Sequence, residues 1–130
     1  MSEKLQSWGR YPPHPQSANP CHWRADLSKS LAKMAVQYGT LLPFGNGRSY
    51  GDSCLAASDQ VLQMRPLDRF ISANWETGLI RAESGVTLDE LLALAVPKGW
   101  FLPVTPGTKF VTLGGALANG LLASLTWTDA

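Results

Sequence analysis

Two stretches of the chain carry apolar residues at helical spacing. After Asp26, apolar side chains recur at i, i+4, i+7 and i+8 on one face until a glycine follows. Thr87 and Glu90 have the spacing of a capping box, and an apolar stripe continues after them. The pattern predicts one helix at 27–38, capped by Asp26, and a second helix from 88 to about 96.

Short apolar runs outside these helices predict strands. The predicted strands are residues 41–42, 61–64, 69–74, 79–83, 100–104 and 111–116. Residues 75–78 form a turn between the third and fourth runs, which joins them into a hairpin. The last run ends in glycines, so we expect a strand that leads into a glycine-rich loop.

The N-terminal part of the chain is rich in proline. Four prolines among the first 24 residues force extended local backbone, so we expect an irregular arm over residues 1–24. Helices and strands follow without repeats, which implies an α+β fold. The composition is 45% hydrophobic and 16% charged, which suits one globular domain.

Charge and cysteine content exclude several classes of function. The formal net charge is +1, so nothing favours nucleic acid or an anionic membrane as a partner. Cys21 and Cys54 lack CxxC spacing and, with His14 and His22, are too scattered for a zinc site, so we expect two free thiols and no metal. Without a signal peptide or an apolar run of spanning length, we expect a cytoplasmic protein.

Two glycine-rich loops, about sixty residues apart, are the main indication of function. Backbone N–H groups without obstructing side chains can converge on phosphate oxygens, so an anion is the expected ligand. The first loop has glycines at 45, 47 and 51 and matches neither the dinucleotide fingerprint nor a Walker sequence. Taken alone, Gly-Asn-Gly is also ordinary hairpin chemistry, and Asp52 could cap its own turn.

Five segments taken together resemble a known family. They cover residues 7 to about 119, and their order and spacing are those of FAD-binding oxidoreductases of the vanillyl-alcohol-oxidase (PCMH) type, especially the decaprenylphosphoryl-ribose 2-oxidase and aldonolactone oxidase branch. The segments are Ser7-Trp8-Gly9-Arg10, Gly47-Arg48-Ser49-Tyr50-Gly51-Asp52, Gly85-Val86-Thr87-Leu88, Leu102-Pro103-Val104-Thr105-Pro106-Gly107-Thr108 and Val111-Thr112-Leu113-Gly114-Gly115-Ala116-Leu117-Ala118-Asn119.

The resemblance implies a partial PCMH-type FAD-binding domain over residues 25–119 and FAD as its cofactor. The implied cofactor-binding residues are Gly45, Asn46, Gly47, Arg48, Ser49, Tyr50, Gly51, Asp52, Ser53, Gly107, Thr112, Leu113, Gly114, Gly115 and Asn119. Alternatives stay open for several of them: Arg48 could be a solvated arginine, Tyr50 a packing residue, Thr112 a strand residue and Asp52 a structural cap.

The resemblance ends after Asn119, and residues 120–130 form a divergent tail. The family continues into further flavin contacts and a substrate domain, so we expect a truncated chain with no assignable catalytic residue, inactive alone. In the complete family the chemistry implied is hydride transfer to flavin from a carbon bearing a hydroxyl, on a sugar-like or lactone substrate. Exposed edges of strands such as 111–115 would favour self-association.

Two other functions remain open at this stage. The same loops could hold a nucleotide or another phosphorylated ligand without redox chemistry. Alternatively, the glycines could serve only to make turns, in a structural fragment that assembles with other chains.

Overall fold

The computed structural model describes residues 4–120 and 128–129 of the chain. The chain divides into two compact units, residues 1–67 and 68–130, each with its own buried apolar cluster or clusters. This boundary falls within residues 25–119, the segment predicted as one partial domain. Among the described residues, no helix is both long and apolar enough to cross a bilayer. Most of the predicted tail, residues 121–127 and 130, lies outside the described residues.

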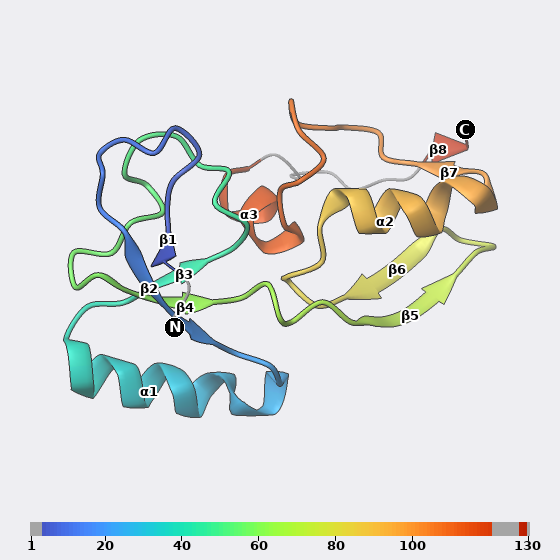
Figure 1. The fold of residues 1–130 in the computed structure, drawn as a ribbon. Helices are drawn as coiled ribbons and strands as arrows, with labels where there is room; N and C mark the ends of the chain where they lie inside the picture. The colour runs from blue at the N-terminus through green and yellow to red at the C-terminus, as the bar shows by residue number, and fades with distance from the viewer. Residues whose placement is uncertain (1–3, 121–127, 130) are drawn as a thin grey trace. The chain divides into compact units, whose positions relative to one another are not determined.

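A four-stranded sheet forms the centre of the first unit (Figure 1). Its order is β1-β2-β4-β3; β1 runs antiparallel to β2, whereas β2 and β3 both run parallel to β4. The strands are β1 (Lys4–Leu5), β2 (Gln16–Pro20), β3 (Leu42–Phe44) and β4 (Gln60–Gln63). The prediction of an irregular arm was wrong for β1 and β2, because the extended backbone that prolines favour can also pair as a strand.

Helix α1 (Leu27–Tyr38) has the bounds that the apolar spacing predicted, and Gly39 ends it with a φ of 76°. The predicted cap was wrong, since the Asp26 side chain makes no capping hydrogen bond. A 3-10 turn, η1 (Arg24–Asp26), runs directly into the helix and leaves Asp26 with helical rather than extended backbone. The aspartate is therefore not in the conformation from which an N-cap side chain reaches back.

Apolar side chains cover both faces of this sheet. Val61 and Leu62 are neighbours in β4, so their side chains point to opposite faces. Leu62 joins the cluster under α1 with Cys21 and Met34, while Val61 joins a second cluster with Cys54. Both cysteines are free, as predicted, and both are buried. Burial raises the pKa of the Cys54 thiol, which keeps it protonated at neutral pH.

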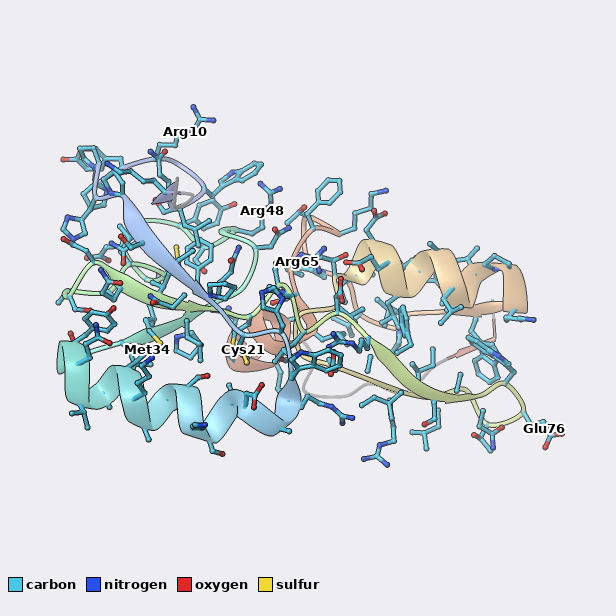
Figure 2. The ribbon with its side chains drawn as sticks, turned by 60° about the horizontal axis from the view of Figure 1, so that its bottom comes forward. Arg10, Cys21, Met34, Arg48, Arg65 and Glu76 are labelled. Carbon is cyan, nitrogen blue, oxygen red and sulfur yellow. The ribbon has the colours of Figure 1, made fainter. Side chains whose placement is uncertain are left out.

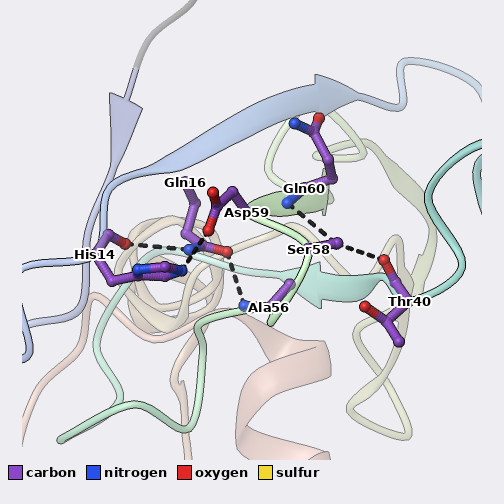
Figure 3. Close-up of polar contacts among 7 residues, drawn as sticks. All are labelled: His14, Gln16, Thr40, Ala56, Ser58, Asp59 and Gln60. Atoms are coloured by element: carbon purple, nitrogen blue, oxygen red, sulfur yellow. Dashed lines mark hydrogen bonds and ion pairs between the residues drawn. The ribbon is translucent and has the colours of Figure 1, made fainter.

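A buried glutamine connects the start of β2 to the chain before β4 (Figure 3). The side chain of Gln16 is fully buried; its Oε1 accepts from the Ala56 amide at 2.7 Å, and its Nε2 donates to the His14 carbonyl at 3.1 Å. The His14 ring pairs with the carboxylate of Asp59. The histidine thus has a local structural partner.

The second unit contains the predicted hairpin, β5 (Phe70–Asn74) and β6 (Leu79–Ala82). The Oδ1 atom of Asn74 accepts from the amides of Glu76 and Thr77 within its turn. Gly78 has a φ of 72°, and a Cβ there would lie 2.7 Å from the ring of Trp100. The turn therefore requires glycine at this position for both conformation and space.

The predicted capping box begins helix α2 (Leu88–Ala95), with Thr87 and Glu90 bonded reciprocally. The helix packs Leu88 and Leu91 into a cluster with Val86 and Leu102. A 3-10 turn, η2 (Val96–Lys98), follows it. The predicted strand at 100–104 is shorter than expected: β7 (Trp100–Phe101) pairs antiparallel with β8 (Thr128–Asp129).

The run 111–116 is not a strand, contrary to prediction. Thr112 caps a short helix, α3 (Leu113–Ala118), by accepting at Oγ1 from the Gly115 amide at 3.1 Å. Within the described residues, the ladder contact of this run is a single antiparallel bridge between Thr112 and Thr87. A threonine N-cap followed by a helix overrode the β-branched residues and glycines that suggested a strand and loop.

Candidate anion-binding site

A cavity of about 360 Å³ opens in the first unit, beside the first glycine-rich loop. Three parts of the chain line it: the N-terminal segment from Lys4 to Arg10, the end of β3 with the loop residues 45–48, and the end of β4 with Gln63 and Arg65. Because β3 and β4 are parallel neighbours, the segments that follow them begin at the same edge of the sheet. Ligand sites are common at this end of parallel strands.

The lining of the cavity is cationic. It includes Lys4, Arg10, Arg48 and Arg65, and none of the lining residues that the structure describes is an aspartate or glutamate. Figure 2 labels three of these residues: Arg10 in the N-terminal segment, Arg48 in the loop after β3, and Arg65 just beyond β4. Cations that share a concave surface raise its positive potential, so the cavity favours an anionic ligand.

Gly47 lets the loop lie against the N-terminal segment. Its φ is 62°, and a Cβ there would lie 2.9 Å from the Gln6 carbonyl oxygen and 3.0 Å from Cζ of Phe44. The resemblance implied that the glycines of this loop allow a ligand to approach closely. At Gly47 the chain instead approaches its own backbone closely, and this contact forms the wall of the cavity.

Arg48 is positioned by the segment across from it. Its guanidinium lies over the ring of Trp8, 4.5 Å from the centroid. The Trp8 amide donates to the Ser49 carbonyl at 3.3 Å. This bond connects the N-terminal segment to the loop one residue after Arg48.

The predicted site residues 45–53, the first group, fall into two sets in the structure, one in the cavity lining and one outside it. Gly45, Asn46, Gly47 and Arg48 are partly buried and line the cavity. The four residues that follow Ser49, residues 50–53, are exposed and do not belong to the lining. Within that stretch, the Ser53 hydroxyl donates to the Tyr50 carbonyl at 2.7 Å, and the Leu55 amide donates to the Asp52 carbonyl.

The second group of predicted residues lies in the second unit, where several of its donors are already bonded. The amides of Leu113, Gly114 and Gly115 donate to Val86, Ser84 and Thr112 respectively. The side chain of Asn119 donates to the Gly115 carbonyl at 2.7 Å. Gly107 is exposed, with open space where a Cβ would lie. Any contact between these residues and a ligand would therefore be made by atoms other than these bonded N–H groups.

Lys4, Arg10 and Arg65 were not among the predicted site residues. No local motif identifies Arg65, because its place in the cavity depends on the parallel pairing of β3 with β4. Arg10 stood within a recognised segment but had no assigned role.

Comparison with known proteins identifies the class. The family model described as an FAD binding domain matches residues 10–127, which is most of the chain. The chain therefore belongs to the FAD binding domain family, and the predicted cofactor, FAD, is the one that this family binds. The match runs past Asn119 and so includes most of the segment predicted to diverge.

A curated relative and two solved structures define the likeness further. The chain is 34% identical over 117 residues to decaprenylphosphoryl-beta-D-ribose oxidase of Mycolicibacterium smegmatis, covering 89% of this chain and 25% of that protein. Alkyldihydroxyacetonephosphate synthase matches with a TM-score of 0.66 at 20% identity, over 81% of this chain and 22% of that one. A His121Ala mutant of cholesterol oxidase from Brevibacterium sterolicum matches with a TM-score of 0.70 at 15% identity, over 91% and 24%.

These findings confirm the predicted fold class, a mixed α+β arrangement that matches part of a PCMH-type FAD-binding domain. The two structural matches are too low in sequence identity to show more than the fold. The chain spans about a quarter of the length of the relatives named here.

Proposed function

We propose that this chain holds the diphosphate of FAD in the cationic cavity of its first unit, as part of a flavin-dependent oxidoreductase. The observation that carries the proposal is the set of four basic side chains around the cavity, whose described lining residues include no carboxylate. A diphosphate carries negative charge on both phosphoryl groups, so it fits this lining. Membership of the FAD binding domain family supports the same ligand.

The residues of the cavity have separate roles in this proposal. The backbone of residues 45–47 provides a surface close to the ligand, while Arg48 and Arg65 provide charge-assisted hydrogen bonds to phosphate oxygens. The proposal also includes ligand contacts from residues 49–53 and from the second group of predicted residues, which are Gly107, Thr112, Leu113, Gly114, Gly115 and Asn119. When bound, FAD supplies the redox chemistry, and this chain's contribution is to bind and orient it.

For the complete protein we propose oxidation of a CH–OH group on a sugar-like or lactone substrate. Support comes from the name of the Mycolicibacterium relative, an oxidase of a phosphorylated ribose derivative. We further propose that the chain alone is inactive towards such alcohols and that it resides in the cytoplasm. Reduction of a dye acceptor by the FAD-supplemented chain with ribose-type substrates would contradict the proposed inactivity.

Binding of FAD is tested by titrating the full chain with FAD and following flavin fluorescence. We expect saturable quenching, and we expect Arg65→Ala to weaken binding by about 10-fold, since a hydrogen bond to a charged group contributes about 1.5–3 kcal/mol. Lys29→Ala removes the same charge from an exposed position of α1 and should leave the affinity within about 2-fold, given the screening of exposed charges.

Failure of wild-type protein to bind FAD at high micromolar concentration would contradict the proposed function. Equal affinity for ADP and FAD would favour the alternative of a nucleotide-binding module without redox chemistry. An equal loss in Arg65→Ala and Lys29→Ala would mean that net charge, not the cavity, determines binding.

We also propose that copies of this chain self-associate through the outer edge of β5. All five residues of β5 are exposed, and none is charged or a proline, the residue types that commonly protect an edge from pairing. The edges of residues 111–115, named in the sequence analysis, are not available for this role because that segment forms the start of α3.

A further inference from the structure

Ser7 is a buried polar residue that lines the cationic cavity. It is 4% exposed, and its Oγ atom has no hydrogen-bond partner among the residues that the structure describes. Native proteins rarely leave a buried hydroxyl in this state, because its interaction with water is lost without replacement. An unpartnered hydroxyl in the wall of a cavity therefore points to a ligand atom.

The backbone around Ser7 is fixed, so its position does not depend on the hydroxyl. The Ser7 carbonyl accepts from the Arg10 amide at 3.1 Å, and the next amide, that of Trp8, donates to the Ser49 carbonyl. The Trp8 ring in turn supports the guanidinium of Arg48. Ser7 is thus held opposite the glycine-rich loop, within the same cavity.

We propose that the Ser7 hydroxyl donates a hydrogen bond to a diphosphate oxygen, so that the N-terminal segment is a second binding wall facing residues 45–48. This inference rests on the proposed function for its ligand. A hydroxyl can donate one proton, and the cations around it favour a negatively charged acceptor. A water molecule would satisfy the hydroxyl alone, whereas a phosphate oxygen also complements the positive lining.

A site with two walls selects the length of its ligand. The loop wall contributes the backbone at 45–47 and Arg48, and the N-terminal wall contributes Ser7. One phosphoryl group contacts one wall well, whereas two linked phosphoryl groups engage both. The site should therefore bind pyrophosphate, ADP and FAD more tightly than inorganic phosphate or FMN.

The test compares wild-type full chain with Ser7→Ala and Ser7→Thr, using inorganic pyrophosphate by calorimetry and FAD and riboflavin by fluorescence. We expect Ser7→Ala to lose about 10-fold in affinity for pyrophosphate and FAD, the magnitude of one charge-assisted hydrogen bond. Riboflavin has no diphosphate, so its weak binding should not change. Ser7→Thr keeps the hydroxyl and should restore most of the affinity, which a merely structural loss would not do.

The outcomes separate this inference from the proposed function. Wild-type affinity for pyrophosphate in Ser7→Ala, or no pyrophosphate binding by the wild type, overturns the inference even if FAD binds. Ser7-dependent binding of pyrophosphate without binding of FAD supports the inference and contradicts the proposed function. If Ser7→Ala does not fold, amide chemical shifts of Ser7 and Trp8 in the wild type decide: they should move on addition of pyrophosphate, and unchanged shifts overturn the inference.

Discussion

At the scale of single residues, Gly47 and Gly51 have nearly the same φ angle but different surroundings. Their φ angles are 62° and 59°, yet only at Gly47 would a Cβ meet other atoms, at 2.9 Å from the Gln6 carbonyl. Gly51→Ala should cost about 1 kcal/mol for the left-handed conformation alone. Gly47→Ala should cost about 2–4 kcal/mol in all, because the two walls of the cavity must separate.

Urea unfolding of the two variants measures this difference, and titration with pyrophosphate measures its effect on the site. Gly47→Ala should weaken both stability and pyrophosphate binding more than Gly51→Ala does, because Gly47 lines the cavity and Gly51 does not. Equal losses of stability in the two variants would mean that the contact with Gln6 does not constrain the loop.

At the scale of elements, the two long helices begin in different ways. In α2, the side chains of Thr87 and Glu90 satisfy amides at the helix start, whereas the Asp26 side chain before α1 makes no such bond. Thr87→Ala should therefore destabilise the chain by about 1 kcal/mol, and Asp26→Ala should change stability by less than about 0.5 kcal/mol. Thermal or urea unfolding of this pair checks the prediction, and a larger loss for Asp26→Ala would contradict it.

At the scale of the whole molecule, the proposed self-association depends on the edge of β5. Ile71 is 40% exposed on this uncharged strand, so Ile71→Lys should shift the protein towards the monomer. Val36→Lys adds the same charge on α1, at a side chain that is 91% exposed, and should leave the distribution unchanged. Sedimentation velocity over a range of concentrations measures both, and a wild type that stays monomeric throughout would contradict the proposal.

Local features of this protein were predictable from the sequence. The bounds of α1, the capping box of α2 and the β5–β6 hairpin depend on residues only a few positions apart, so their spacing is sufficient to specify them. The family was also predictable from the five motifs, because they span most of the chain in a fixed order. The glycines at 45 and 47 belong to the loop that borders the cavity.

The tertiary structure decided which distant residues share the site. Strand β2 lay hidden in a proline-rich segment because its partner, β4, is more than forty residues away. Arg65 and Ser7 join the loop at 45–48 only through the parallel pairing of β3 with β4 and the packing of Gln6 against Gly47. Local propensity contains no information about such pairings, since their free energy comes from contacts between segments distant in sequence. The sequence by itself therefore determined α1, the start of α2, the β5–β6 hairpin and the class of ligand, while the fold determined the remaining strands and the composition of the cavity.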